Sequence, residues 1–249
     1  MSNLSASWPY PKLIAHRGAG RFAPENTLAS MRLGAQHGFT MMEYDVKLSK
    51  DGVAVLLHDD SVDRTSNGAG NAAEKTYNEL AQLDFGGWHS RDYAGEPIPT
   101  LYAIAAFTQA NAIFSNIEIK PHTGTEAQTG TQVARLAQQL WANAPAPLLS
   151  SFSEVALQAA LDAAPELPRA LLIAKELPAD WQARLSRLKC VSLNMSHKYV
   201  TRQIVESAHA EGYKISIWTV NDPMRARELF DWGCDAIFTD EIKTITPSF

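Results

Sequence analysis

The chain has 249 residues, of which 45% are hydrophobic, and its formal net charge is -5 at pH 7. This length and apolar content suit one large core, so we expect a single domain over residues 1–249. The acidic balance, without a block of about five or six basic residues, argues against nucleic acid or an anionic membrane surface as a partner. A small molecule is the better expectation.

No segment of the chain has the pattern of a membrane anchor or an export signal. Residues 1–11 lack a basic stretch followed by an apolar run, and no later apolar stretch approaches the roughly 18 to 20 residues that cross a bilayer. We therefore expect a cytoplasmic location without stable membrane insertion. The oligomeric state stays open.

Short apolar or β-branched segments alternate with helical patterns along the chain. Strands are predicted over residues 12–15, 41–48, 114–119, 148–152, 170–173, 191–195, 214–220 and 236–239. Helices are predicted over residues 25–37, 101–110, 130–141, 154–163, 181–188, 201–211 and 223–232. Strand–helix alternation gives a parallel sheet, and eight such units close it. The fold class predicted is α/β, a (β/α)8 TIM barrel.

Residues 60–99 interrupt this alternation, because they stand between the second strand and the helix expected after it. A connection far beyond about 15 residues in a compact barrel is usually functional. We interpret it as an inserted lid or substrate-binding subdomain. Its aromatic residues Phe85, Trp88 and Tyr93 favour a small core of its own over an idle surface loop.

Acidic residues follow the alternation of two neighbouring strands. Glu43 and Asp45 share one face of the second strand, because side chains at positions i and i+2 point the same way, and Glu118 and Lys120 repeat this on the next strand. Three carboxylates at the barrel mouth make a hard oxygen site suited to Mg2+ or Ca2+. The alternative is that they form ion pairs with Lys47 and Lys120.

His58 follows a predicted hairpin with Asp51-Gly52 at its turn. A two-residue loop would place His58 opposite Asp45, and a four-residue loop would place it opposite Glu43. Both registers put the imidazole on the carboxylate face. A three-residue loop would turn it away, because a slip of one residue reverses every side chain.

His16 ends the first strand and precedes Arg17, at the barrel face where active sites of this fold lie. Imidazoles of His16 and His58 beside a metal site would supply acid and base near neutral pH. Arg17 and Lys120 suit an anion, and Arg17 suits bidentate contact with phosphate. Trp218 is expected as a pocket wall or as a core aromatic at the rim. Together these groups indicate phosphate-ester chemistry.

A series of short motifs runs along the chain. In order, they are His16-Arg17-Gly18, Pro24-Glu25-Asn26-Thr27, Glu43-Tyr44-Asp45, His58-Asp59, Arg64-Thr65, Asn67-Gly68, Ile117-Glu118-Ile119-Lys120, Ser151-Phe152 and Trp218-Thr219-Val220-Asn221. With these motifs the chain resembles the glycerophosphodiester phosphodiesterases, and most of all their short cytosolic bacterial members. The resemblance covers nearly the whole chain and includes residues 95–101 as the exit from an inserted subdomain.

This resemblance implies metal-dependent hydrolysis of glycerophosphodiesters, such as glycerophosphocholine and glycerophosphoethanolamine, to sn-glycerol 3-phosphate and an alcohol. The site residues that it implies are Glu43, Asp45 and Glu118 as ligands of the divalent cation, His16 and His58 as general acid and base, and Glu25 and Asn26 as supporting residues. Three alternatives stay open: Mg2+ or Ca2+, which histidine is the acid, and whether water or the glycerol 2-hydroxyl is the nucleophile.

Two other functions compete with this one. A barrel phosphodiesterase that acts on intact phospholipids would need an apolar rim or a basic membrane-facing loop, whereas residues 60–99 are mixed and polar. A non-catalytic phosphate-ligand binding protein would show damage to the histidine pair or the carboxylates, and the sequence retains all of them.

Overall fold

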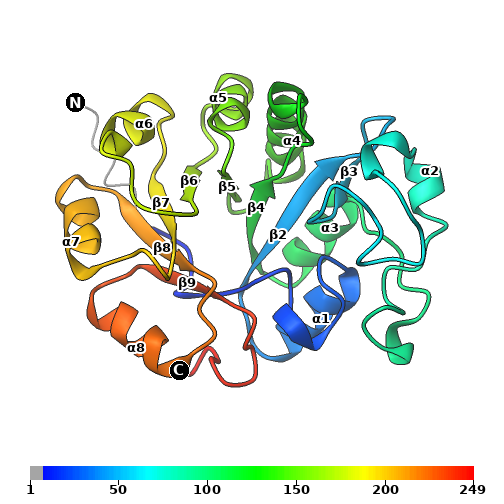
Figure 1. Ribbon diagram of the computed structural model, residues 1–249, viewed down its shortest axis with the longest axis horizontal. Coiled ribbons are helices and arrows are strands. Elements are labelled where there is room, and N and C mark those ends of the chain that lie inside the picture. Colours follow the sequence, from blue (N-terminus) through cyan, green and yellow to red (C-terminus); the bar gives the residue numbers. More distant parts are fainter. Residues whose placement is uncertain (1–7) are drawn as a thin grey trace.

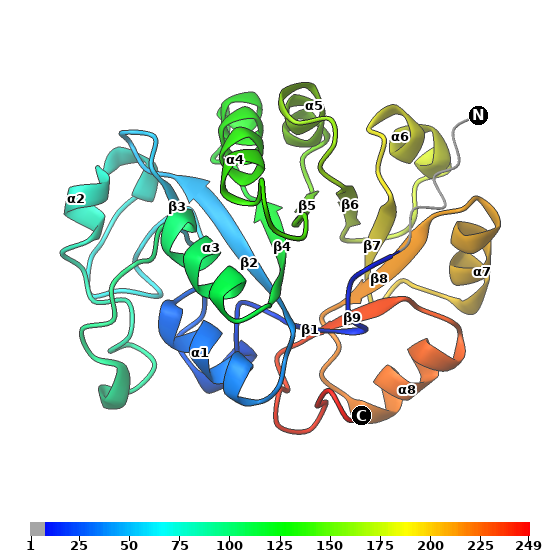
Figure 2. The same cartoon turned by 180° about the vertical axis from the view of Figure 1, so that it is seen from behind.

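The computed structural model describes residues 8–249. Within this range, eight parallel strands pair in the order β1-β9-β8-β7-β6-β5-β4-β2, and β1 also pairs with β2, which closes the barrel (Figures 1 and 2). The strands are β1 (Leu13–Ala15), β2 (Met41–Leu48), β4 (Phe114–Ile119), β5 (Leu148–Ser151), β6 (Arg169–Ile173), β7 (Ser192–Ser196), β8 (Lys214–Trp218) and β9 (Ala236–Thr239). The predicted TIM barrel is confirmed.

Helices surround the barrel and bury their apolar faces against it (Figure 1). They are α1 (Leu28–Gln36), α3 (Leu101–Ala110), α4 (Glu126–Leu140), α5 (Glu154–Ala163), α6 (Trp181–Arg187), α7 (Arg202–Ala210) and α8 (Pro223–Asp231). The longest, α4, has 15 residues, and within residues 8–249 no helix combines the length and apolar content that crossing a bilayer needs.

The first helix begins later than the sequence pattern predicted. The prediction placed its start at Glu25, whereas α1 begins at Leu28, because Thr27 caps the helix and its side chain accepts a hydrogen bond from the Ser30 amide. Asn26, just before the cap, has a φ of 59°, which no helix can accommodate. Glu25 and Asn26 therefore lie in the loop that leads into α1.

The hairpin after β2 has a different register from the two expected ones. β3 (Ala54–Leu56) is antiparallel to β2, with Val46 opposite Leu56, and the Ser49 amide donates to the Val53 carbonyl around a three-residue turn. This register was predicted to turn His58 away from the carboxylates, and that part of the prediction was wrong. β3 ends at Leu56, so His58 lies beyond the strand and its alternation, and its side chain lines the cavity at the barrel mouth.

Residues 60–99 form the lobe that contains α2 (Tyr77–Leu80), cyan in Figure 1, and two 3-10 helices, Ala72–Glu74 and Arg91–Tyr93. Of the three aromatic residues expected in a local core, only Phe85 belongs to it, since Trp88 is 39% exposed and Tyr93 packs on the main core. The residues that form the local cluster are Val55, Leu57, Val62, Ala72, Leu80, Phe85 and Ile98. A single domain with an insertion at 60–99 stays a prediction, which this separate cluster supports.

The turn after β1 is held directly against α1. The Ser30 hydroxyl donates to the Arg17 carbonyl at 2.9 Å, and Gly34 lies so close that a Cβ there would be 2.1 Å from the Gly18 carbonyl oxygen. The absence of a side chain at Gly34 therefore lets the helix fix the segment that carries His16 and Arg17.

The substitution Gly34→Ala tests this close approach. Alanine is favoured over glycine inside a helix by about 1 kcal/mol, so without the contact the change would stabilise the protein. Because the methyl group would meet backbone, we expect instead a loss of about 1–3 kcal/mol in the free energy of unfolding, measured by thermal or denaturant unfolding. An unchanged or raised melting temperature would contradict the contact.

Candidate active site

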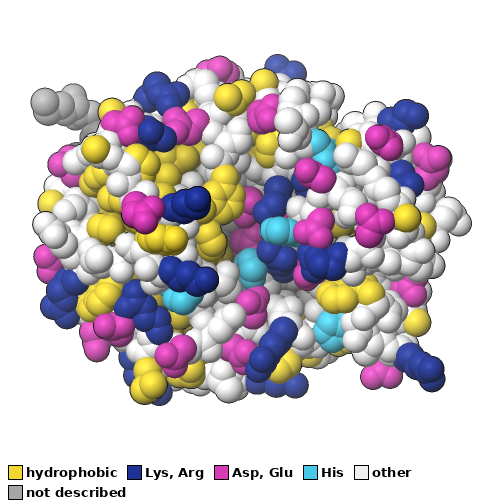
Figure 3. All heavy atoms as spheres, viewed as in Figure 1, with side chains coloured by type: hydrophobic (Ala, Val, Ile, Leu, Met, Phe, Trp, Pro, Cys, Tyr) yellow, Lys and Arg dark blue, Asp and Glu magenta, His cyan; other side chains and the backbone are white. Residues whose placement is uncertain are grey.

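The carboxyl ends of the barrel strands surround a cavity of about 120 Å³. In Figure 3, basic, acidic and histidine side chains gather in the central hollow, and hydrophobic side chains border it on the left. The polar lining consists of His16, Arg17, Glu43, His58, Asn116, Glu118, Lys120, Ser150 and Thr219, and the apolar lining of Phe152, Leu172, Trp218 and Phe238. The cavity thus has a charged side and an apolar side.

Three buried carboxylates lie together at the base of this site. The register of β2 on β4 places Asp45 opposite Glu118, and Glu43 lies two residues earlier on the same face. One oxygen from each of the three lies within 4.8 Å of the others, although the residues are only 3%, 1% and 9% exposed for Glu43, Asp45 and Glu118. The strand alternation predicted this cluster correctly.

The negative charge of Asp45 is well compensated by neighbouring cationic groups and a hydrogen-bond donor. Lys120 Nζ lies 3.2 Å from Asp45 Oδ1, and Arg17 Nε lies 3.4 Å from Asp45 Oδ2. Asn26 makes a reciprocal pair with Asp45: its amide donates to Oδ2 at 2.8 Å, and its oxygen accepts from the Asp45 backbone amide at 3.0 Å. Burial alone would raise the pKa of Asp45, but the charges of Lys120 and Arg17 outweigh it and hold this pKa below the usual range.

The ionised forms of Glu43 and Glu118 have much less compensation from neighbouring positive charge. Burial, with the charge of Asp45 added, raises the pKa of Glu43 to about 8, and the same two causes raise the pKa of Glu118. Among residues 8–249, Glu43 Oε1 is buried without a hydrogen-bond partner. Three hard oxygen donors, of which two lack sufficient cationic partners within the protein, fit a divalent cation such as Mg2+ or Ca2+.

The alternative of ion pairs with Lys47 and Lys120 holds only for one lysine. Lys120 contacts Glu118 at 3.0 Å as well as Asp45, whereas the ammonium of Lys47 lies 2.6 Å from Asp60 instead. One lysine and one arginine therefore face three carboxylates.

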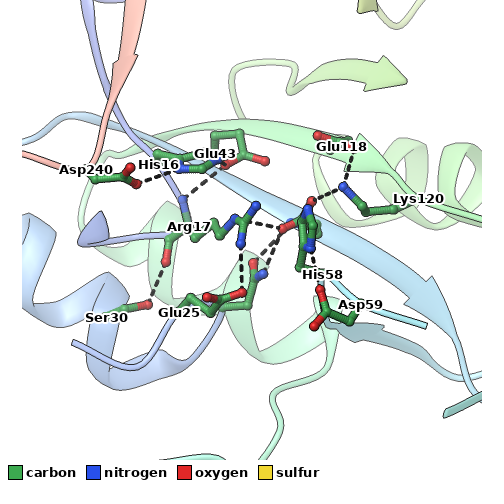
Figure 4. Close-up of polar contacts among 12 residues, drawn as sticks. His16, Arg17, Glu25, Ser30, Glu43, His58, Asp59, Glu118, Lys120 and Asp240 are labelled. Atoms are coloured by element: carbon green, nitrogen blue, oxygen red, sulfur yellow. Dashed lines mark hydrogen bonds and ion pairs between the residues drawn. The ribbon is translucent and has the colours of Figure 1, made fainter. Parts of the chain in front are cut away.

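His16 lies between two carboxylates, as Figure 4 shows. Its Nδ1 is 2.6 Å from Asp240 Oδ1, and its Nε2 is 3.8 Å from Glu43 Oε2. Burial would lower the pKa of His16, but the hydrogen bond to Asp240 and the charge of Glu43 raise it overall. The sequence prediction missed Asp240. It follows β9 at the same barrel face, so its position at a strand end was the signal that could have found it.

His58 has a parallel arrangement on the other side of the site (Figure 4). Its Nδ1 is 2.7 Å from Asp59 Oδ1, and burial lowers its pKa. Because a carboxylate engages Nδ1 in both His16 and His58, the Nε2 atoms are left for the cavity. The two imidazoles are thereby oriented alike but have pKa values shifted in opposite directions.

Arg17 contacts carboxylates through both its backbone and its side chain, and neighbouring residues hold it in place. The backbone amide of Arg17 donates to Glu43 Oε2 at 3.0 Å, and its guanidinium donates to Glu25 Oε1 at 2.8 Å. Arg17 and Asn26 have backbone φ values of 52° and 59°, in the left-handed region that residues other than glycine rarely adopt. Glu25 and Asn26 thus support Arg17 and Asp45, respectively.

Trp218 lines the cavity and also packs against a buried cluster of the barrel core, so the structure shows both of its expected positions. Its ring meets the ring of Phe152 edge to face, with centroids 5.4 Å apart, and Lys120 Nζ lies 5.9 Å from the Phe152 centroid. Phe152 was assigned to a strand by the sequence pattern, but β5 ends at Ser151 and Phe152 is 43% exposed.

The fold and the site together define a class, the barrel enzymes that hydrolyse phosphate diesters. Comparison with known proteins specifies the family. The model of the glycerophosphoryl diester phosphodiesterase family matches residues 16–244. The glycerophosphodiester phosphodiesterase of Caldanaerobacter subterraneus subsp. tengcongensis is 33% identical over 234 residues, which cover 94% of this chain and 95% of that protein.

Two solved structures are similar over nearly their whole length. A phosphodiesterase of Oleispira antarctica, in complex with the product sn-glycerol-3-phosphate, has 38% identity, a TM-score of 0.91 and a coverage of 95% of both chains. A glycerophosphodiester phosphodiesterase of Agrobacterium tumefaciens has 30% identity and a TM-score of 0.77, and the match covers 93% of this chain and 97% of that one. The chain belongs to the glycerophosphodiester phosphodiesterase family and is an enzyme of this kind.

Proposed function

We propose that the enzyme uses a divalent cation to hydrolyse glycerophosphodiesters, such as glycerophosphocholine and glycerophosphoethanolamine, to sn-glycerol 3-phosphate and an alcohol. The observation that carries this proposal is one cavity of about 120 Å³ that is lined by two carboxylate-bound histidines and by Glu43 and Glu118, whose carboxylates cluster with that of the adjacent Asp45. The product bound to the related Oleispira antarctica enzyme supports the same substrate class.

Glu43, Asp45 and Glu118 would hold the cation, because they offer three hard oxygen donors and because Glu43 and Glu118 are poorly compensated by the protein itself. When bound, Mg2+ or Ca2+ would supply positive charge to a phosphoryl oxygen and to the glycerol hydroxyls. All-oxygen ligation suits either ion.

Arg17 and Lys120 would bind the phosphate and stabilise the charge that develops as the phosphorus becomes five-coordinate. Both side chains line the cavity, and a carboxylate holds each in place: Glu25 for Arg17, and Glu118, which itself lines the cavity, for Lys120. Trp218 would form the apolar wall beside the bound diester.

The histidine pair would move the protons. The raised pKa of His16 favours it as the acid that protonates the departing alkoxide, and the lowered pKa of His58 favours it as the base that deprotonates the nucleophile. Either the glycerol 2-hydroxyl attacks, which gives a cyclic phosphate that water then opens, or water attacks directly. Both routes use the same two Nε2 atoms. The cytoplasmic location and the absence of nucleic-acid partners stay predictions from the sequence.

The first test is release of sn-glycerol 3-phosphate from glycerophosphocholine by protein stripped with a chelator. We expect the stripped protein to be inactive and Mg2+ or Ca2+, supplied separately, to restore release, because the carboxylate cluster is incomplete without a cation. Glycerophosphoethanolamine serves as a second substrate. No release from either substrate with either ion would contradict the proposed function.

The second test separates the acid–base pair from the cation ligands. His16→Ala and His58→Ala should each lower turnover by about 10²–10⁴-fold, the usual contribution of general acid–base catalysis, and leave cation affinity near that of the wild type. Glu118→Gln should instead shift the cation titration to higher concentrations.

The matched control is His209→Ala, since His209 also pairs with an aspartate, Asp235 at 2.9 Å, but is 38% exposed in its side chain and absent from the cavity lining. Wild-type turnover in His16→Ala or His58→Ala would remove that histidine from the mechanism. An unchanged cation titration in Glu118→Gln would sink its role as a ligand.

A further inference from the structure

Arg64, at the start of the inserted lobe, binds two carboxylates at once. Its Nη1 and Nη2 donate to Glu25 Oε2 and Oε1, each at 2.8 Å, so this contact is bidentate. Its Nε and Nη2 donate to Asp59 Oδ2 and Oδ1 at 2.7 and 3.1 Å. One planar guanidinium therefore lies between Glu25 and Asp59 and uses all three of its nitrogens.

Each of these carboxylates also holds a residue of the active site. Glu25 Oε1 accepts from Arg17 Nη1 at 2.8 Å, and Asp59 Oδ1 lies 2.7 Å from His58 Nδ1. Arg64 is thus linked through one intervening carboxylate to Arg17, the proposed phosphate-binding residue, and through another to His58, one of the two proposed proton-transfer residues. It is not among the residues that line the cavity.

We propose that Arg64 is a positioning residue that fixes the distance and angle between His58 and Arg17. This inference rests on the proposed function, because it assigns to Arg64 the task of keeping an acid–base group and a phosphate-binding group in register. It also gives the inserted lobe a part in catalysis that needs no contact with the substrate.

The energetics favour positioning over simple stabilisation. The side chain of Arg64 is 45% exposed, and exposed ion pairs contribute only about 0–1 kcal/mol to folding. Bidentate guanidinium–carboxylate contacts, however, fix geometry in a way that a lysine ammonium cannot. The hydrogen bond from Arg64 is the first cause that holds the pKa of Asp59 below its usual range, so the group facing His58 Nδ1 stays an anion.

The test uses the full-length enzyme with cation and glycerophosphocholine. Arg64→Gln should lower kcat by about 10- to 100-fold, because a supporting residue or a displacement of about 1 Å typically costs this much. Arg64→Lys should not restore kcat, since an ammonium cannot bridge both carboxylates. Added guanidinium ion, far below denaturing concentrations, should partly restore kcat in Arg64→Ala, whereas equal ammonium or sodium should not.

Arg184→Gln is the matched control. Arg184 also bridges two carboxylates, Asp180 and Glu154, each at 2.9 Å, but its neighbourhood on α5 and α6 is not part of the cavity lining. We expect both glutamine variants to have similar melting temperatures and only Arg64→Gln to lose turnover. Equal kcat in Arg64→Gln and the wild type would overturn the inference, and so would a loss that guanidinium does not relieve.

A double-mutant cycle supplies an independent readout. The effects of Glu25→Gln and Asp59→Asn on kcat should be non-additive when Arg64 is present and additive in the Arg64→Gln background, because the guanidinium is the link between them. Additivity in both backgrounds would overturn the inference. A wild-type enzyme that releases no product would instead contradict the proposed function, so the two failures are distinguishable.

Discussion

The mutual repulsion of three buried carboxylates is the constraint on which this structure depends. Glu43, Asp45 and Glu118 each bring an oxygen within 4.8 Å of the others, in a place almost closed to water. Bringing such charges out of water is costly unless each is paired or coordinates a metal. The protein supplies two cationic groups, Arg17 and Lys120: both lie beside Asp45, and Lys120 is shared with Glu118. Glu43 and Glu118 are less well compensated, and a divalent cation would stabilise their ionised forms.

Supporting residues from distant parts of the chain hold this arrangement in place. Asp240, after the last barrel strand, orients His16, and Asn26, in the loop before α1, closes a reciprocal pair with Asp45. Gly34 lets α1 lie against the turn that carries Arg17. Arg64 joins the inserted lobe to the same network. The barrel thus fixes where the strand ends lie, and hydrogen bonds from the supporting residues fix the orientation of the side chains that these ends carry.

Much of this could be predicted from the sequence, for definite physical reasons. The period of two along residues 41–48 and 114–119 fixes which face a side chain takes, so the sequence predicts that Glu43, Asp45 and Glu118 lie together, as they do. Strand–helix alternation likewise predicts the closed barrel, and His16 at a strand end lines the cavity at the barrel mouth, as its position predicts.

The parts that could not be predicted depend on irregular backbone and on tertiary contacts. His58 lies on the carboxylate side as predicted, but not for the predicted reason. The observed hairpin register would turn the His58 side chain away if the strand continued. Because β3 ends at Leu56, His58 does not follow the strand alternation. The partners of Asp240 and Arg64 are residues that are 224 and 39 positions away, and a local pattern does not identify them, although the place of Asp240 at a strand end indicates the barrel face on which it lies. The sequence pattern also places Phe152 inside the fifth barrel strand, whereas β5 ends at Ser151. The exact end of a strand depends on packing and is not encoded by the local pattern.

The most direct test of the central claim is the proton balance of cation binding, measured by calorimetric titration of the chelator-stripped protein with Mg2+ or Ca2+ in buffers of different ionisation enthalpy. Because the pKa of Glu43 is about 8 without the ion, this carboxyl group is mostly protonated at pH 7 and must lose its proton to bind. We expect about one proton to leave per cation at pH 7, fewer at pH 9, and fewer in Glu43→Gln. Failure of both ions to bind, or binding at pH 7 without proton release, would contradict a cation site formed by these three carboxylates.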